Sequence, residues 1–248
     1  MSFFRSLIDS PVISHRYTSA VILAAGEGSR FGNEDGTKQN ALVAGIPAAA
    51  RAALPFQACS EIDEIILVGK ADELSLLESY VKDYELTKVT RVVEGGARRD
   101  ESSMKGAEAV SDKCRYIAIH DAARCLVTEK IIKDTLRAAI KYGSAAAAER
   151  VVDTVKIADN AEFVKETPDR ETVWLVKTPQ IFKFHIYETA AAIARRDGIS
   201  VTDDCMMAEH CGFKIKLVDC GHENIKLTAR EDLALAEFIL SKREDGKR

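Results

Sequence analysis

Apolar, strand-like runs alternate with helix-like stretches along most of this chain. The first run, SAVILAAG, begins at Ser19 and stays apolar up to its glycine, as in a parallel strand buried on both faces. Similar runs cover Glu64–Gly69, Thr90–Gly96 and Arg115–Arg124, with helical patterns of about ten to fifteen residues between them. Parallel strands need right-handed crossovers, so this order predicts an α/β fold with a doubly wound, mostly parallel (Rossmann-like) sheet.

Three polar segments follow three of the expected strands: AAGEGSR, EGGARRD and HDAAR. A sheet of this kind binds its ligands beyond the carboxyl ends of its strands. The topology therefore predicts that the three segments meet in one site.

The alternation breaks after a short strand at Ser144–Glu149. The stretch Val151–Phe182 mixes β-branched and polar residues around turn signals, which indicates a hairpin or extended arm. We expect an N-terminal extension (1–17), a main domain (18–150 and 175–243) and a protruding β-arm (151–174). Helices are expected at about 46–59, 72–83, 101–110, 129–141, 185–195, 203–211 and 231–242, and Pro55 should end or kink the first.

Charge and hydropathy exclude several functional classes. The 35 basic and 39 acidic side chains give a formal net charge of −4, which does not favour general binding to nucleic acids or membrane surfaces. No stretch approaches the roughly 18 apolar residues of a membrane span, and the first residues make a poor signal peptide. The six cysteines include no C-x-x-C pair, so we expect free thiols and a cytoplasmic location.

The loop after the first strand has features of a phosphate-binding loop. Gly26 and Gly28 would let backbone N–H groups approach a phosphate, and Arg30 and Lys38 would neutralise its oxygens. The spacing matches neither a P-loop nor the dinucleotide fingerprint, because Gly32 comes one position late. By itself the loop is equally consistent with a solvated surface loop.

The ordered set of motifs is more specific. In sequence order they are LAAGEGSRFG…TKQ (Leu23–Gln39), GG-x-x-R-x-x-S (Gly95–Ser102), HDAAR (His120–Arg124), DTVK (Asp153–Lys156), DR (Asp169–Arg170), TPQ (Thr178–Gln180), TDD (Thr202–Asp204) and ENIKLT (Glu223–Thr228). Together they resemble the 2-C-methyl-D-erythritol 4-phosphate cytidylyltransferase family from about Ser19 to Leu240.

The resemblance implies an enzyme that condenses CTP with methylerythritol phosphate and releases pyrophosphate. An oxygen of the acceptor phosphate would attack the α-phosphorus in line, so the protein would mainly position and neutralise two polyanions with the help of Mg²⁺. Two alternatives remain open at this point: a sister enzyme that uses ribitol 5-phosphate, and a catalytically silent nucleotide-binding scaffold.

The resemblance also assigns roles to individual positions. Catalytic cations would be Arg30, Lys38 and Lys226, although each could instead be a surface cation. Asp121 would lie near the ribose and hold Mg²⁺, or simply cap a helix. The remaining nucleotide-binding positions would be Ala24, Ala25, Gly26, Gly28, Gly95, Gly96 and Ser102. Contacts to the polyol phosphate would come from Arg124, Thr154, Arg170 and Thr178. In the family the arm with Thr154 and Arg170 crosses to the neighbouring subunit, which implies a homodimer.

Four positions depart from the family pattern. Ala97 stands where an acidic residue is common, Cys125 replaces a proline, Lys177 replaces a neutral residue, and Asn40 follows Lys-Gln where an aromatic residue is usual. None of these departures removes a proposed charge.

Two further features could suggest chemistry: a possible catalytic histidine and a possible zinc site. His120 is expected to be a hydrogen-bonded structural histidine. A zinc site is disfavoured because its candidate ligands lack a known finger spacing; they are Cys205, His210, Cys211, Cys220 and His222.

Overall fold

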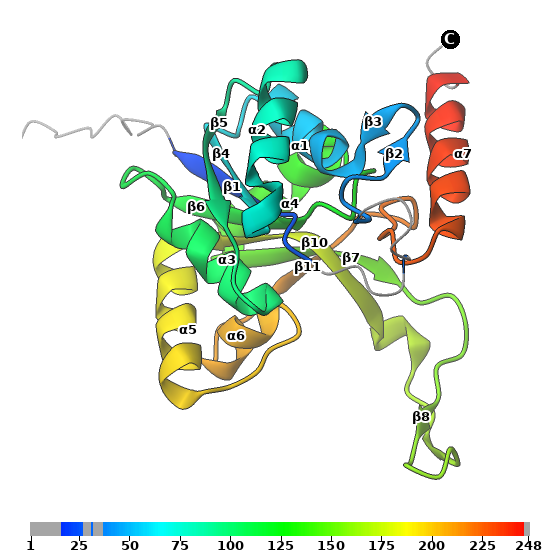
Figure 1. The fold of residues 1–248 in the computed structure, drawn as a ribbon. Helices are drawn as coiled ribbons and strands as arrows, with labels where there is room; N and C mark the ends of the chain where they lie inside the picture. The colour runs from blue at the N-terminus through cyan, green and yellow to red at the C-terminus, as the bar shows by residue number, and fades with distance from the viewer. Residues whose placement is uncertain (1–15, 27–30, 32–36, 246–248) are drawn as a thin grey trace, which may run out of the picture.

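The computed structural model describes residues 16–26, 31 and 37–245, and its centre is a seven-stranded sheet with the order β11-β7-β10-β6-β1-β4-β5 (Figure 1). Neighbouring strands are parallel except where β10 pairs with β6 and β7. The strands are β1 (Thr18–Leu23), β4 (Glu64–Gly69), β5 (Val89–Glu94), β6 (Tyr116–Asp121), β7 (Ser144–Arg150), β10 (Trp174–Lys183) and β11 (Lys216–Asp219). This arrangement confirms the mostly parallel sheet predicted from the sequence.

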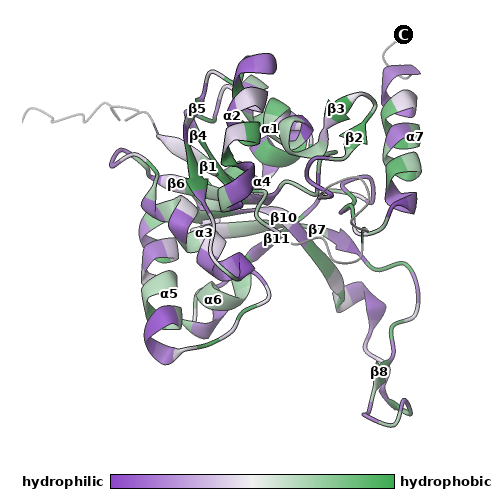
Figure 2. Ribbon diagram, viewed as in Figure 1, coloured by the Kyte–Doolittle hydropathy of each residue, from purple (hydrophilic) through white to green (hydrophobic). Residues whose placement is uncertain are grey.

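Helices cover both faces of this sheet (Figure 1). Side chains alternate between the two faces along each strand, so Ala20 and Ile22 of β1 belong to one hydrophobic core and Val21 and Leu23 to the other. Figure 2 shows the strongly hydrophobic central strands between helices of mixed polarity. The helices are α1 (Ala48–Ala58), α2 (Leu74–Asp83), α3 (Arg99–Glu108), α4 (Glu129–Tyr142), α5 (Phe184–Asp197), α6 (Asp204–His210) and α7 (Glu231–Asp245).

Helix α4 illustrates how local sequence sets these elements. The Thr128 hydroxyl caps its N-terminus by accepting a hydrogen bond from the Ile131 N–H, and Gly143 ends it at a φ of 97°. Between these ends, Ile132 and Leu136 lie four positions apart and are both buried against the sheet. A capped amphipathic helix of this kind packs firmly behind the strands that carry the site.

One of the two effects expected of Pro55, that it ends the first helix, is wrong. Pro55 lies inside α1, which continues to Ala58 instead of ending at the proline. The last turn holds because Phe56 is fully buried and the Cys59 N–H donates to the Pro55 carbonyl at 3.0 Å.

The stretch between β7 and β10 leaves the sheet as an arm. Its tip is the short antiparallel pair β8 (Ile157–Ala158) and β9 (Val164–Glu166), followed by a 3₁₀ turn at Arg170–Thr172. Figure 1 shows the arm projecting from the body, and β10 then returns from it into the central sheet. A second small antiparallel pair, β2 (Leu42–Val43) with β3 (Ile46–Pro47), precedes α1. Across the described residues no helix has the length and apolar character that crossing a membrane requires.

Candidate active site

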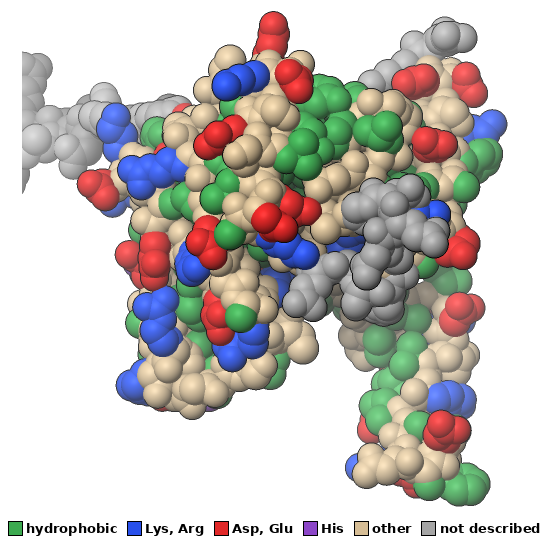
Figure 3. Space-filling model, viewed as in Figure 1, with side chains coloured by type: hydrophobic (Ala, Val, Ile, Leu, Met, Phe, Trp, Pro, Cys, Tyr) green, Lys and Arg blue, Asp and Glu red, His purple; other side chains and the backbone are tan. Residues whose placement is uncertain are grey.

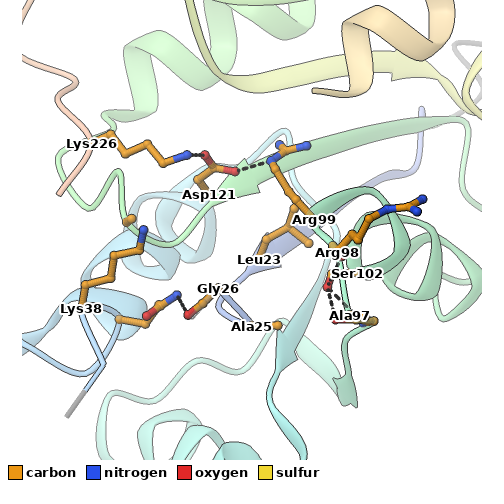
Figure 4. Close-up of a pocket in the computed structure, with 13 residues that line it drawn as sticks. Leu23, Ala25, Gly26, Lys38, Ala97, Arg98, Arg99, Ser102, Asp121 and Lys226 are labelled. Atoms are coloured by element: carbon orange, nitrogen blue, oxygen red, sulfur yellow. Dashed lines mark hydrogen bonds and ion pairs between the residues drawn. The ribbon is translucent and has the colours of Figure 1, made fainter. Parts of the chain in front are cut away.

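A cavity of about 330 Å³ opens at the carboxyl ends of the central strands. It brings together the end of β1, the loop from β5 into α3, the end of β6 and the segment before α7. In Figure 4, Lys38 and Lys226 reach into the cavity from one side and Ala97 and Ser102 lie across from them. The residues that line it are Leu23, Ala25, Gly26, Lys38, Gln39, Gly96, Ala97, Arg98, Arg99, Ser102, Asp121, Ala123 and Lys226.

Asp121 is the carboxylate of this cavity. Lys226 Nζ lies 2.7 Å from its Oδ2 and Arg99 Nε lies 3.0 Å from its Oδ1. Burial opposes ionisation of this group, but the charges of Arg99 and Lys226 outweigh that effect and hold the pKa of Asp121 far below its ordinary value. Asp121 is therefore a carboxylate at any physiological pH.

Neighbours in the chain position Lys226. The Leu227 N–H donates to the Ala123 carbonyl at 2.8 Å, and the Leu227 side chain is fully buried. On the other side, Asn224 donates from Nδ2 to the Thr178 carbonyl at 2.9 Å. Anchored at both ends, this segment presents the ammonium group of Lys226 to the end of β6.

The opposite wall of the cavity is built from small residues. Gly95 packs so closely that an added Cβ would lie 2.7 Å from both Ala25 Cβ and Ser102 Oγ. Ser102 Oγ accepts a hydrogen bond from the Gly96 N–H at 3.0 Å and is almost fully buried. These contacts leave a smooth wall of backbone against which a flat ring could lie.

The end of β1 supplies the floor. Ala24 is buried and its N–H donates to the Val68 carbonyl at 2.7 Å, so its role is to continue the sheet, whereas Ala25 and Gly26 line the cavity. Gln39 Nε2 donates to the Gly26 carbonyl at 2.8 Å. This contact ties Lys38, the neighbour of Gln39, to the edge of the β1 loop.

The other expected site residues are not among the described lining residues. Gly28 and Arg30 lie outside the described residues. Thr154 and Arg170 are exposed on the arm, where Arg170 Nη1 donates to the Val152 carbonyl at 3.2 Å. Within one chain, the projecting arm carries both residues away from the body (Figure 1).

Arg124 and Thr178 lie behind the cavity. Arg124 Nη1 donates to the Asn224 carbonyl at 3.0 Å, and burial lowers the pKa of this guanidinium. Thr178 is buried, and its Oγ1 accepts a hydrogen bond from the Asp121 N–H at 3.1 Å. In this structure both residues support the segments that carry Asp121 and Lys226.

His120 completes the same network. Its Nε2 lies 3.2 Å from the Arg124 carbonyl and its Nδ1 lies 3.0 Å from Thr178 Oγ1. A proton on Nε2 satisfies every member of this chain, with the Thr178 hydroxyl donating to Nδ1. Burial lowers the pKa of His120 to about 4, so the ring is neutral. The expectation of a structural histidine agrees with this geometry.

Sequence reasoning missed one prominent member of the site. Arg99 contacts both Asp121 and Asp204, at 3.0 and 2.7 Å. It is the arginine of the GG-x-x-R-x-x-S motif, so the signal was present, but nothing in the sequence shows that Asp204 comes to meet it across 105 positions.

The departures from the family pattern are accommodated locally. Cys125 is buried, and burial raises its thiol pKa to about 11. Lys177 is buried at the base of the arm, where its Nζ lies 2.6 Å from Glu149 Oε2. Neither residue touches the cavity lining.

Candidate metal ligands are few. In the part of the chain that the structure describes, no group of three or more His, Cys, Asp or Glu side chains is arranged to hold a metal ion. The zinc candidates are not gathered, and His210 instead pairs with Asp197 at 3.1 Å. Asp121 remains as a single carboxylate that could contribute to a cation bound mainly by ligand oxygens.

Taken together, the cavity combines fixed cations, a backbone wall and one ionised carboxylate. Such a set suits a phosphorylated nucleotide, since cations neutralise phosphate oxygens while small residues leave room for a base. No nucleophilic side chain with an adjacent base lies among the described lining residues.

Comparison with known proteins agrees with this chemistry. The family model of IspD, 2-C-methyl-D-erythritol 4-phosphate cytidylyltransferase, matches residues 18–242. A relative of that name from Clostridium botulinum is 38% identical over 224 residues, which span 90% of this chain and 97% of the relative. A second, from Caldanaerobacter subterraneus, is 38% identical over 225 residues, spanning 90% and 99% of the two chains.

Solved structures are similar too. The 4-diphosphocytidyl-2C-methyl-D-erythritol synthase of Anaerococcus prevotii superposes with a TM-score of 0.81 at 29% identity, covering 92% of this chain and 99% of its own. The 2-C-methyl-D-erythritol 4-phosphate cytidylyltransferase of Thermus thermophilus superposes with a TM-score of 0.73 at 28% identity, covering 90% and 98%.

Proposed function

Because the chain belongs to the 2-C-methyl-D-erythritol 4-phosphate cytidylyltransferase family, we infer that it condenses CTP with 2-C-methyl-D-erythritol 4-phosphate, forming 4-diphosphocytidyl-2-C-methyl-D-erythritol and pyrophosphate. The observation that carries this inference is the meeting of Lys38, Lys226 and Asp121 with the Gly96 wall in one cavity. These residues come from four distant parts of the sequence. Binding of a triphosphate at one shared site would explain why they come together.

We propose that Lys38 and Lys226 neutralise the phosphates of CTP, together with Arg30. Both substrates are polyanions, so the acceptor phosphate reaches the α-phosphorus only when fixed cations offset the repulsion. The acceptor oxygen is already a competent nucleophile, so the protein contributes position and charge and needs no general base. Lys226 would exchange its contact with Asp121 for phosphate oxygens when CTP arrives.

The cytosine ring would lie on the backbone wall. Gly95 and Gly96 let this loop pack closely against Ala25, Ser102 and Glu101, and Ser102 holds the Gly96 N–H in place at 3.0 Å. Ala25 and Gly26 line the floor of the cavity, where their backbone groups could read the edge of the base. With Ala97 in place of an acidic residue, these backbone groups would carry more of the base recognition.

We propose that Asp121 helps to hold Mg²⁺ bridged to the triphosphate. Mg²⁺ commonly binds one or two carboxylates together with substrate phosphates and water, and a single carboxylate in an otherwise cationic cavity fits that pattern. When bound, the ion would neutralise charge that develops on the phosphate oxygens. Ile119 and His120, which precede Asp121 in β6, are fully buried and give the carboxylate a rigid base.

We propose that the arm joins two copies into a homodimer. It exposes an unusual amount of apolar surface, including Val152 at 77%, Phe163 at 72% and Val164 at 61% (Figure 3). A second copy of the chain would cover this surface. In such a dimer Thr154 and Arg170 would reach the partner's site and bind the polyol phosphate.

A reducing compartment such as the cytoplasm is the proposed location. All six cysteines are free thiols, four of them buried, as expected where disulfides do not form. Secretion into an oxidising space would leave these thiols open to oxidation on unfolding.

The direct test measures pyrophosphate release by the purified protein with CTP, Mg²⁺ and methylerythritol phosphate. Turnover should require all three, and methylerythritol phosphate should outcompete ribitol 5-phosphate when both are present. A folded protein that binds CTP but releases no pyrophosphate with either acceptor would refute the assignment. Sedimentation velocity on the same preparation tests the dimer, and a monomer at micromolar concentration would contradict the proposed role of the arm.

A further inference from the structure

The TDD segment, Thr202–Asp204, has no role in the site described so far. Asp203 caps α6 by accepting a hydrogen bond from the Met206 N–H at 2.9 Å. Asp204, the first residue of α6, points the other way and its side chain has no solvent exposure. A fully buried carboxylate is costly unless it is paired, so its partner matters.

The partner is Arg99 of the active-site cavity. Arg99 Nη1 lies 2.7 Å from Asp204 Oδ2, while Nε of the same guanidinium lies 3.0 Å from Asp121 Oδ1. Its Nη2 is buried and has no hydrogen-bond partner among the described residues. One guanidinium therefore spans two carboxylates, one inside the cavity and one behind it, as the dashed contact to Asp121 in Figure 4 illustrates.

Asp204 is held rigidly from several elements. Its Oδ1 accepts a short hydrogen bond from Ser103 of α3, and the Ser103 hydroxyl also lies 2.6 Å from the Tyr187 hydroxyl of α5. Gln180 of β10 accepts hydrogen bonds from the N–H groups of Asp204 and Cys205, at 3.0 and 3.2 Å. Groups from α3, α5 and β10 thus fix the carboxylate that holds Arg99.

We propose that Asp204 is a positioning residue for the nucleotide and metal site, acting through Arg99 on Asp121. By pairing with Nη1, Asp204 fixes the orientation of the Arg99 guanidinium, so that Nε meets Asp121 Oδ1 while Lys226 holds Oδ2. Released from Asp204, the guanidinium could turn and bind both oxygens of Asp121, the bidentate geometry that arginine–carboxylate pairs favour. The inference rests on the proposed role of Asp121 in binding Mg²⁺ with CTP.

The charges support this arrangement. Asp121 and Asp204 carry two negative charges and Arg99 and Lys226 carry two positive ones, so the four-residue cluster is neutral. Loss of the Asp204 charge would leave one excess positive charge beside Asp121, which disfavours a second cation there. It would not weaken the attraction for the phosphates themselves. The predicted defect is therefore specific to the metal.

The test is calorimetric titration of CTP into the protein, with Mg²⁺ and in EDTA. We expect Asp204→Asn to raise the Kd for CTP about tenfold in Mg²⁺, the scale seen when groups behind a metal ligand are changed, and to leave the Kd in EDTA within about twofold. The matched control is Glu209→Gln, which removes the same charge from an exposed carboxylate on α6. It should change neither Kd.

A double variant tests the route through Arg99. Lysine cannot span two carboxylates, so Arg99→Lys should show the same metal-specific defect, and adding Asp204→Asn should cause little further change. Equal weakening in Mg²⁺ and EDTA, full additivity, or no change in the Kd of Asp204→Asn would overturn the proposal.

Should Asp204→Asn not fold, Ser103→Ala removes one hydrogen bond from Asp204 without changing charge, and a metal-specific rise of about threefold in Kd is expected; its absence would refute the inference. A wild-type protein that binds CTP equally well with and without Mg²⁺ would instead refute the proposed role of Asp121, and this inference with it.

Discussion

Lys226 Nζ lies 2.7 Å from Asp121 Oδ2, although 105 residues separate them in the chain. The side chain of Lys226 is 36% exposed and that of Asp121 is 10% exposed, so the pair sits at the mouth of the cavity and not deep in the core. An ion pair in that position can be broken by a ligand at modest cost, since solvent reaches the lysine. We propose that the pair keeps both groups in place until a triphosphate binds.

The first prediction concerns this lysine. Replacing Lys226 with alanine should lower kcat by about 10²-fold or more, the scale expected when one electrostatic contact to a transition state is removed. The fold should survive because Asp121 keeps its contact with Arg99 at 3.0 Å. Steady-state kinetics and thermal melting measure the two effects.

The control is Lys130→Ala, which removes a lysine that is 83% exposed on α4 and does not line the cavity. It should leave kcat unchanged. A Lys226→Ala variant with wild-type kcat and an intact fold would remove this residue from the catalytic set.

The sequence was sufficient to predict the sheet and the meeting of its polar ends. Buried parallel strands are mostly apolar, so runs such as Ile65–Val68 are visible in the sequence without any tertiary information. The position of Asp121 also followed, because the carboxyl ends of β1, β5 and β6 share one edge of the sheet.

Contacts between side chains that are far apart in the sequence could not be predicted from such patterns. Arg99 meets Asp204 only because α3 and α6 cover the same face of the sheet, and no periodicity reports that. Thr178 was expected at the substrate, whereas in this structure its hydroxyl accepts from the Asp121 N–H, a use that depends on how β10 pairs with β6. Of the two effects expected of Pro55, ending the helix is wrong, because burial of Phe56 outweighs the local helix-breaking tendency.

The second prediction follows from the buried His120. Its pKa falls from 6.5 in the unfolded chain to about 4 in the folded protein, chiefly through burial. Between these values the unfolded state binds more protons, so stability is lost as the pH falls from 6.5 toward 4. The loss attributable to this residue should reach about 3 kcal/mol across that window.

Urea unfolding at about pH 7 and about pH 5, without CTP or divalent ions, measures this effect. Carboxylates titrate in the same range, so the comparison is with His120→Gln, which keeps a donor and an acceptor but no titration. The variant should lose less stability on acidification. Parallel pH profiles of the two proteins would show that His120 is not the titrating group.

The third prediction concerns the approach of α3 to the sheet. A Cβ on Gly106 would lie 2.3 Å from Val21 Cγ1 and 2.9 Å from Val68 Cγ2. Gly106→Ala should therefore lower the free energy of unfolding by about 1–3 kcal/mol, despite the better helix propensity of alanine. Truncating the valine as well, in Gly106→Ala/Val21→Ala, should cost less than the sum of the single variants, because the clash is relieved. Strict additivity in urea unfolding would contradict the packing explanation.

The fourth prediction tests whether the arm completes a neighbouring site. Lys38 lines the cavity of the body, whereas Arg170 is exposed on the arm of the same chain. If the arm of each chain completes the site of the partner subunit, a mixed dimer of Lys38→Ala and Arg170→Ala chains contains one site with both changes and one with neither.

The single variants should each be nearly inactive as homodimers, Arg170→Ala mainly through a raised KM for the polyol phosphate. Purified mixed dimers, isolated with two different affinity tags, should recover up to about half of the wild-type activity, as one intact site out of two requires. The control is a dimer of two Lys38→Ala chains that carry the two different tags, because no exchange of arms can restore its activity.

If verified Lys38→Ala/Arg170→Ala mixed dimers remain as inactive as their parents, each site draws its arm residues from its own chain, and the shared-site arrangement is wrong.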